Sequence, residues 1–213
     1  MERPDKKPCF EPITKKSFSE FCGFLYEKEL VTGVGGNVSA RFDGRFLVTS
    51  SGLSLRKTRP ESILLVKPDG YIPKNPRPSK EFAMHLEIYT RRPEVNVVCH
   101  VHGSYIIAAS TMTKTGRNSM PALTPGFAYF AYPLPMLPFL VPGTSELAEA
   151  VGQQFSNRKL RALLLQNHGL VTVGTNLTEA LNIAEEIHEN AMVYVITGGK
   201  GSVIPGDSIK KIF

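Results

Sequence analysis

Two histidines separated by one residue lie in the segment 98–103, which reads Val-Cys-His-Val-His-Gly. In a β-strand alternate side chains share a face, so His100 and His102 would point to one side and Cys99 and Val101 to the other. Two imidazoles on one face can bind a single metal ion, whereas burying both without partners is costly. An ordinary pair of hydrogen-bonded histidines at a strand end is the alternative, and a third ligand would decide between them.

A second apolar stretch ends in the same way. Residues 162–165 predict a strand, and Gln-Asn-His-Gly follows at 166–169. His168 lies far from His102 in the sequence, but both follow apolar strands that we expect in one sheet, and open α/β sheets bind ligands at the carboxyl ends of their strands. Three neutral imidazoles with one open position are typical of a catalytic divalent ion, usually zinc. We therefore expect a metal centre at which a substrate can bind.

Two turns have the composition of an anion site. Residues 33–39 form a glycine-rich turn that leads into a polar strand, and residues 49–52, Thr-Ser-Ser-Gly, follow another strand. Both can present backbone N–H groups and hydroxyls to a phosphate. Neither has the lysine spacing of a Walker loop or the third glycine of a dinucleotide fingerprint, and a tight turn with self-satisfying polar groups remains the alternative for each.

The segment 78–81, Pro-Ser-Lys-Glu, predicts the start of a helix. With Ser79 as the N-cap, Glu81 falls in the first helical turn, where a carboxylate ordinarily serves the helix itself. Next to a metal centre the same carboxylate could move a proton, because burial would raise its pKa toward the range useful for acid/base chemistry.

Helices and strands alternate around these segments, without an internal repeat. The apolar spacing and the Gly and Pro positions predict helices at 14–30 and 79–91, from 105, from 144 or 145, and at 178–197, and strands at 46–49, 63–66, 95–102 and 162–165. A turn is expected at 67–70 and a proline-rich crossing at 121–142.

Composition limits the class of protein. A chain of 213 residues that is 42% hydrophobic suits one globular domain over residues 1–213. Its net charge of +6 is spread without interleaved aromatics, which argues against nucleic acid as a partner and is typical of a solvated surface. Attraction of a small anionic substrate is the weaker alternative. No apolar run suggests a signal peptide or a membrane partner, so we expect a cytoplasmic protein. Cys9, Cys22 and Cys99 predict reduced thiols.

Taken in order, five motifs resemble the class II aldolase/adducin family over roughly residues 15–197. They are Gly36-Asn37-Val38-Ser39, Thr49-Ser50-Ser51-Gly52, Pro78-Ser79-Lys80-Glu81, His100-Val101-His102 and Asn167-His168-Gly169. The resemblance implies an α/β fold with three layers, α/β/α, around a mostly antiparallel sheet. It also implies one zinc or other divalent ion per subunit, and a homotetramer with active sites at its interfaces.

Mapped motif by motif, the resemblance assigns a role to each site residue. His100, His102 and His168 would be the metal ligands and Glu81 the acid/base residue. The substrate phosphate would be held by Gly36, Asn37, Ser51, Gly52 and Ser79. The implied activity is that of a lyase of carbohydrate metabolism, which reversibly cleaves a phosphorylated ketose to dihydroxyacetone phosphate and an aldehyde through a zinc-stabilised enediolate.

Departures from the aldolase pattern leave two alternatives. Lys80 stands where fuculose-phosphate aldolases have a second serine, and Pro125 stands where an aldehyde-side tyrosine is expected, although Tyr129 or Tyr132 could replace it. Lys80 is therefore a candidate substrate contact, and the proline pattern resembles the branch that decarboxylates 3-oxo-tetronate 4-phosphates. A non-catalytic, adducin-like interaction module is the other alternative, but it is expected to lack a full ligand set. His85 and His188 fall in predicted helices, where we expect supporting roles.

Overall fold

The computed structural model describes residues 11–68 and 76–212. The strands are β1 (Asn37–Phe42), β2 (Arg45–Val48), β3 (Leu64–Val66), β4 (Val97–Val101), β5 (Met136–Leu137), β6 (Ala162–Leu165) and β7 (Gly169–Gly174). The α-helices are α1 (Lys15–Glu27), α2 (Phe82–Arg91), α3 (Ser104–Met112), α4 (Pro125–Phe130), α5 (Ser145–Phe155), α6 (Leu177–Ile196) and α7 (Gly206–Ile209), and two short 3-10 helices cover Leu55–Lys57 and Pro60–Ser62.

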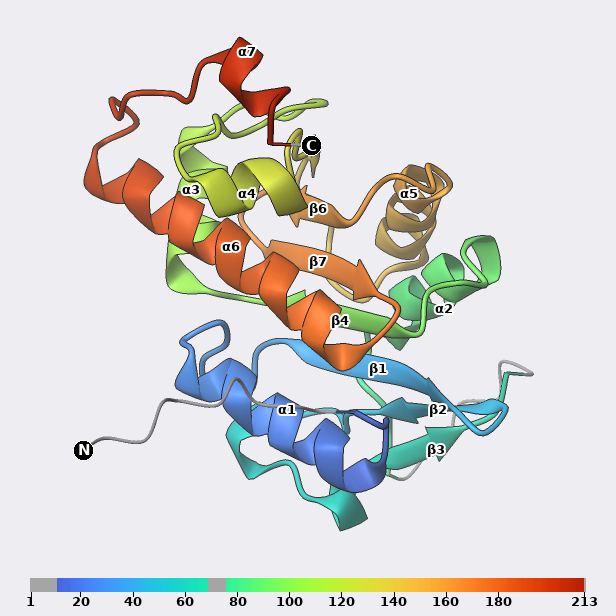
Figure 1. Cartoon of the computed structure of the whole chain (residues 1–213). Coiled ribbons are helices and arrows are strands. Elements are labelled where there is room, and N and C mark those ends of the chain that lie inside the picture. Colours follow the sequence, from blue (N-terminus) through green and yellow to red (C-terminus); the bar gives the residue numbers. More distant parts are fainter. Residues whose placement is uncertain (1–10, 69–75, 213) are drawn as a thin grey trace.

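Within the described residues the strands form one sheet of seven, in the order β3-β2-β1-β4-β7-β6-β5. All neighbours are antiparallel except β5 and β6. Helices α1, α3, α4 and α6 supply the core on one face, and α2 and α5 supply the core on the other (Figure 1). The predicted fold, three layers around a mostly antiparallel sheet, is confirmed.

Strand β4 is buried on both faces because helices cover both sides of the sheet. Cys99 and Val101 pack into the core formed with α1, α3 and α6, whereas Val98 packs into the core formed with α2 and α5. His100 alternates with Cys99 and Val101, so it shares the face of Val98 and is fully buried. The strand thus presents an imidazole to the side on which α2 begins.

The order of the strands explains why histidines far apart in the sequence converge. Strand β7 pairs antiparallel with both β4 and β6, so β4 and β6 run in the same direction and end at the same edge of the sheet. His102 follows β4, and His168 occupies the tight turn from β6 into β7. The register places Leu170 opposite Val101 and Gly169 opposite Leu165, which brings the two histidine-bearing segments together.

Several elements differ from the sequence-based expectations. Helix α2 begins at Phe82 with Glu81 as its N-cap, so the prediction of Ser79 as the cap is wrong. A turn closed by the Phe82 N–H and the Ser79 carbonyl, 3.0 Å apart, delays the helix. Strand β7 had not been predicted, nor had α4 and β5 within the proline-rich crossing.

The remaining expectations concern cysteines, a turn and membrane spans. Cys22 and Cys99 are buried free thiols, as predicted, whereas Cys9 and part of the expected turn at 67–70 lie outside the described residues. Among the described residues, no helix combines the length and apolar character that crossing a bilayer requires.

Asn190 holds the proline-rich crossing against the body of the fold. This side chain on α6 is fully buried, and its Oδ1 accepts the backbone N–H groups of Leu123 and Thr124 at 2.8 and 3.1 Å. Its Nδ2 donates to the Pro121 carbonyl at 3.0 Å. One amide therefore satisfies three backbone groups of a segment that has few strand partners.

We expect Asn190→Ala to lower the free energy of unfolding by about 2–4 kcal/mol, because it leaves three backbone groups of a half-buried segment without their partner. Asn96→Ala is the matched control, since half-buried Asn96 makes one solvent-exposed hydrogen bond from its side chain, to the Thr175 carbonyl, and should cost less than about 1 kcal/mol. Urea unfolding of both variants measures the difference, and equal losses would show that Asn190 does not have this role.

Candidate metal centre and active site

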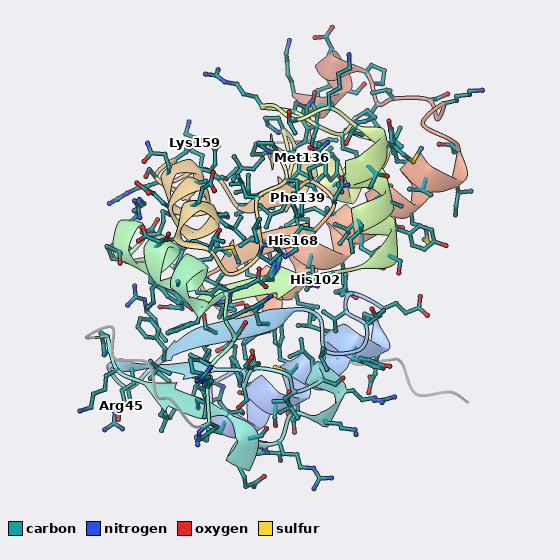
Figure 2. The ribbon with its side chains drawn as sticks, turned by 180° about the vertical axis from the view of Figure 1, so that it is seen from behind. Arg45, His102, Met136, Phe139, Lys159 and His168 are labelled. Carbon is teal, nitrogen blue, oxygen red and sulfur yellow. The ribbon has the colours of Figure 1, made fainter. Side chains whose placement is uncertain are left out.

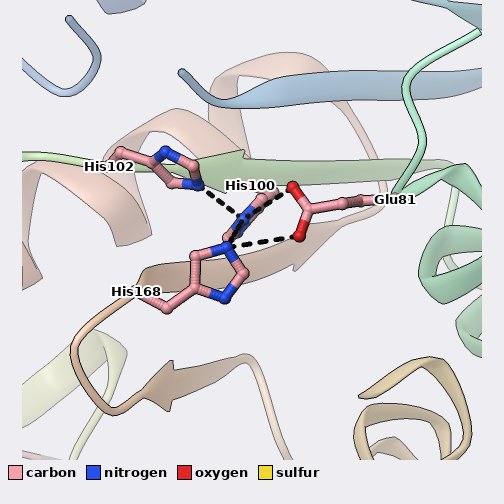
Figure 3. Close-up of side chains that lie close together, drawn as sticks. All are labelled: Glu81, His100, His102 and His168. Carbon is pink, nitrogen blue, oxygen red and sulfur yellow. Dashed lines mark hydrogen bonds and ion pairs between the residues drawn. The ribbon is translucent and has the colours of Figure 1, made fainter. Parts of the chain in front are cut away.

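One carboxylate and three imidazoles meet at the edge of the sheet where β4 and β6 end (Figure 3). Ligand atoms of Glu81, His100, His102 and His168 all lie within 4.8 Å of one another. The Nε2 atom of His100 is 2.8 Å from that of His102 and 3.3 Å from that of His168. Seen from behind, His102 and His168 lie next to each other near the middle of the molecule (Figure 2). The structure thus brings together the residues predicted as ligands and as acid/base.

The donor set fits a divalent metal ion. The Nδ1 atom of His100 lies 3.0 Å from the Leu170 carbonyl and donates to it, which leaves Nε2 as the ring nitrogen that can bind a metal ion. Burial, followed by the charges of His100 and His168, lowers the pKa of His102 to about 3, so this ring is neutral at pH 7. Converging ring nitrogens repel one another unless a cation or a proton lies between them. Three imidazoles that leave one position open are typical of catalytic zinc sites.

The glycine after His168 is required by the closeness of the rings. A Cβ atom on Gly169 would stand 2.3 Å from the Val101 carbonyl oxygen and 2.8 Å from Cδ2 of His102. No side chain fits in this space, because the strand and the imidazole occupy it. This contact explains why the sequence reads His-Gly at this ligand.

Ser110 supports His168 through the turn that precedes it, and sequence analysis had not found it. Asn167 has a left-handed backbone with φ of 57°, and its N–H donates to the Ser110 Oγ at 2.9 Å. The buried Ser110 hydroxyl donates to the Ile107 carbonyl at 2.7 Å. Helix α3 begins two residues after His102, so the same helix connects this histidine to the turn that holds His168. No local motif signals this contact.

Glu81 is buried against two of the histidines. Its Oε1 lies 3.2 Å from His168 Nε2, its Oε2 lies 3.4 Å from His100 Nε2, and Oε2 accepts from Asn37 Nδ2 at 3.1 Å. Burial raises the pKa of Glu81, but the charge of His100 and the hydrogen bonds from His100 and His168 together outweigh it, so the pKa falls below its ordinary value. The expectation of a raised pKa is therefore wrong, because the imidazoles contribute more than desolvation does.

The segments predicted to hold phosphate are joined by hydrogen bonds. The Ser51 N–H donates to the Arg77 carbonyl at 2.8 Å, and the Ser79 N–H donates to the Thr49 carbonyl at 3.1 Å. The Thr49 hydroxyl accepts the Val38 N–H at 3.1 Å, next to Asn37. The two turns and the start of α2 thus form one connected structure beside Glu81.

The residues predicted to hold phosphate differ in exposure. Ser51 and Gly52 are exposed and Ser79 is half-buried. Gly36 has a positive φ of 76°, close to the His100 carbonyl. Asn37 is buried and holds Glu81, which the sequence had not indicated. Asn37 is therefore less available to a ligand than Ser51 is.

Lys80 and the two candidate tyrosines lie in different places. The methylenes of exposed Lys80 pack against Gly143, and its charge reaches His102, where it contributes to the lowered pKa. Tyr129 and Tyr132 line a cavity of about 520 Å³ together with Lys159 and Arg161. None of the predicted site residues lines that cavity, so within one described chain these tyrosines are separate from Glu81.

Comparisons with known proteins agree with this geometry. The family model described as "Class II Aldolase and Adducin N-terminal domain" matches residues 16–195. The chain is 37% identical to the L-fuculose phosphate aldolase of Methanococcus vannielii, over 83% of this chain and 92% of that protein. It is 32% identical to the 3-oxo-tetronate 4-phosphate decarboxylase of Haemophilus influenzae, over 83% and 84%. The solved structure of Escherichia coli YgbL superposes with a TM-score of 0.85 at 26% identity, covering 93% of this chain and 96% of YgbL.

Ser110→Ala should weaken binding of a divalent metal ion about 10-fold, because the turn before His168 loses its anchor. Ser119→Ala is the matched control, since Ser119 is a buried serine whose hydroxyl donates to the Leu134 carbonyl at 3.0 Å, away from the candidate site. Competition with a chromophoric chelator measures both affinities. Equal affinities for the two variants would mean that Ser110 does not position His168.

Proposed function

Because this chain belongs to the class II aldolase and adducin family, we propose that it is a metal-dependent carbon–carbon lyase. Its reaction would be the reversible aldol cleavage of a phosphorylated ketose to dihydroxyacetone phosphate and an aldehyde. The observation that carries the proposal is a buried Glu81, with a lowered pKa, that contacts two of three converging histidines able to bind one ion. A non-catalytic interaction module would have no need of this costly group of buried polar residues.

Each side chain of the candidate site has a role in this proposal. His100, His102 and His168 would hold one zinc or similar divalent ion per subunit. When bound, the ion supplies Lewis-acid stabilisation of the negative charge that develops when the carbon–carbon bond breaks. Glu81 would move a proton at the carbon next to the carbonyl, and Asn37 would orient it through the 3.1 Å hydrogen bond.

The substrate phosphate would bind at the connected turns. Gly36, Ser51, Gly52 and Ser79 would offer backbone N–H groups and hydroxyls, with Asn37 at the Glu81 side. Charge-assisted hydrogen bonds of this kind favour phosphorylated over unphosphorylated substrates. The net charge of +6 supports attraction of an anionic sugar.

We also propose a cytoplasmic homotetramer with active sites at its interfaces. Exposed apolar side chains near the candidate site support this, because Phe139 and Val141 are 53% and 57% exposed in the segment that leads to Gly143 beneath Lys80. A tyrosine missing from one chain's site could then come from a neighbouring subunit.

Decarboxylation of a 3-oxo-tetronate 4-phosphate is the second candidate. The observation that favours it is the cation of Lys80, whose field reaches His102 and could orient a departing carboxylate. Retro-aldol cleavage needs a base or relay on the aldehyde side, which decarboxylation does not. Similarity to a curated decarboxylase adds support. The ligand set and the phosphate turns suit aldol cleavage as well as they suit decarboxylation. We favour aldol cleavage because the chain is 37% identical to a curated aldolase and 32% identical to the curated decarboxylase.

To test the function, we would incubate purified protein of measured metal content with fuculose 1-phosphate, ribulose 1-phosphate or 3-oxo-tetronate 4-phosphate, each in a separate assay of aldehyde and carbon dioxide release. We expect aldehyde release from a ketose phosphate with the highest kcat/KM. Much faster release of carbon dioxide would establish the decarboxylase instead, and activity on none of the three would favour the interaction module.

Removing one imidazole should remove the metal. We expect purified protein to bind about one divalent ion per chain and His168→Ala to lose most of it, because His168 is one of only three imidazoles in the ligand set. Metal analysis after dialysis measures this, and His188→Ala, at a half-buried histidine on α6, is the control. Unchanged metal content in His168→Ala would contradict the ligand assignment.

Glu81→Gln should keep the fold and the metal but lose at least about 100-fold in kcat, the usual scale for a positioned proton-transfer group. Exchange of a carbon-bound hydrogen of dihydroxyacetone phosphate with deuterated water follows the step directly. Glu87→Gln, on the same helix but partly exposed, should exchange like wild type. Fast exchange by Glu81→Gln would exclude this residue as the acid/base.

A further inference from the structure

A row of polar contacts joins one face of β1 to helix α2, in register with the candidate site. The pairs are Asn37–Glu81, Ser39–His85 and Arg41–Tyr89. They are spaced two residues apart on the strand and four apart on the helix, which corresponds to about 6.6 Å and about 6 Å per step. Because the steps match, successive strand residues contact successive helix residues, and Ser39 also contacts Tyr89. We call these three pairs the β1–α2 ladder and each pair a rung. Its first rung, Asn37–Glu81, is the one that contacts the histidines.

His85, the helix residue of the middle rung, is buried, and one of its ring nitrogens makes no hydrogen bond. Its Nδ1 lies 2.7 Å from the Ser39 Oγ, which in turn lies 2.9 Å from the Tyr89 hydroxyl. Burial, together with the charge of His100, lowers the pKa of His85 to about 3, so the ring is neutral and carries one proton. Its Nε2 is buried without a hydrogen-bond partner among the described residues.

The hydrogen bonds allow the proton of His85 to lie on either ring nitrogen. In one of the two arrangements Tyr89 donates to Ser39 and Ser39 donates to His85 Nδ1, so that both contacts run in one direction. His85 then carries its proton on Nε2. This is our assignment of the tautomer, and it makes Nε2–H an unpaired buried donor, which is costly unless an acceptor becomes available.

The acceptors nearest in the ladder belong to its first rung. Helical side chains lean toward the N-terminus of their helix, so the His85 ring lies toward Glu81, one turn earlier. Two oxygens there are also buried: Asn37 Oδ1 has no hydrogen-bond partner in the described part of the chain, and Glu81 Oε1 faces His168 Nε2 at 3.2 Å. An unpaired donor and an unpaired acceptor thus lie between the same strand and helix, beside a carboxylate oxygen that faces His168.

Glu81 needs such a donor when the histidines bind an ion. Its two oxygens now face the Nε2 atoms of His168 and His100. Those nitrogens have no proton to share once their lone pairs hold a metal. The amide of Asn37 and the Nε2–H of His85 are then the ladder donors that can hold the carboxylate.

We propose that His85 is a positioning residue that donates from Nε2 to Glu81 when the histidines hold a metal ion, and so keeps the carboxylate placed for proton transfer. The inference rests on the proposed function for its catalytic consequence, but not for the hydrogen bond itself. It assigns to His85 a specific action on Glu81 in place of a general supporting role.

The hydrogen bond can be tested without any activity. In protein labelled with ¹⁵N-histidine, the His85 signals, identified by their loss in His85→Gln, should show a protonated Nε2 and an unprotonated Nδ1. Zinc should move the Nε2–H proton downfield in wild type but not in Glu81→Ala. A proton on Nδ1, or the same response to zinc in both proteins, would overturn the proposal.

Kinetics test the consequence with side chains that mimic each ring nitrogen. His85→Gln keeps an amide near the position of Nε2, His85→Asn keeps one near Nδ1, and His85→Leu keeps neither. The kinetics would use whichever substrate the wild-type enzyme turns over. We expect His85→Leu and His85→Asn to lower kcat about 10- to 100-fold while KM stays within about threefold of wild type. His85→Gln should retain most of the rate.

Met84→Leu is the control for disturbance of α2, because Met84 is buried in the apolar core of the same helix and should keep kcat near wild type. Full activity in His85→Asn with loss in His85→Gln would show that only the Ser39 contact matters, which would overturn the proposal. Inactivity of wild type on every substrate would reject the proposed function alone, because the NMR result still decides the role of His85.

Discussion

Burying three imidazoles and a carboxylate at one point is unfavourable without fixed partners, and the surrounding structure supplies several of them. The Leu170 carbonyl fixes the ring of His100, and Asn37 fixes Glu81. Gly169 leaves the space that the rings occupy, and Ser110 holds the turn that presents His168. These contacts come from β1, β7 and α3, so the site depends on the sheet and on one face helix together.

The antiparallel sheet fixes the position of His100 more firmly than a loop could. His100 lies within a strand that has hydrogen-bonded neighbours on both sides, and its register partners are Asn37 on β1 and Val171 on β7. A shift of register by one residue would turn His100 to the opposite face, into the core that holds Cys99. The apolar cores on both faces oppose such a shift, because it would expose their side chains to polar neighbours. Packing far from the site therefore determines the direction of the imidazole.

Much of the site could be predicted from the sequence because strand periodicity is local. The alternation that puts His100 and His102 on one side, and the His-Gly pair at 168, are visible without long-range information. The apolar patterns predicted individual helices and strands, whereas the three-layer fold was implied by the family resemblance that the ordered motifs carry. The pairing that brings His168 to His102 required β7, which sequence analysis had not predicted, and α4 had been missed because Pro125, at its first position, had been interpreted as part of a crossing. The lowered pKa of Glu81 and the roles of Ser110 and Asn190 depend on tertiary contacts, which no local pattern reveals.

The matched spacing of β1 and α2 has a consequence for how this protein can vary in length. Three rungs stay aligned only because two strand residues and four helix residues advance by almost the same distance. A single insertion or deletion between Asn37 and Arg41 would reverse the faces of every later strand residue, and one between Glu81 and Tyr89 would rotate the following helix positions by about 100°. Substitutions can be absorbed singly, but a change of length here disconnects all later rungs together. Length variation among relatives should therefore collect in the connections outside these two elements.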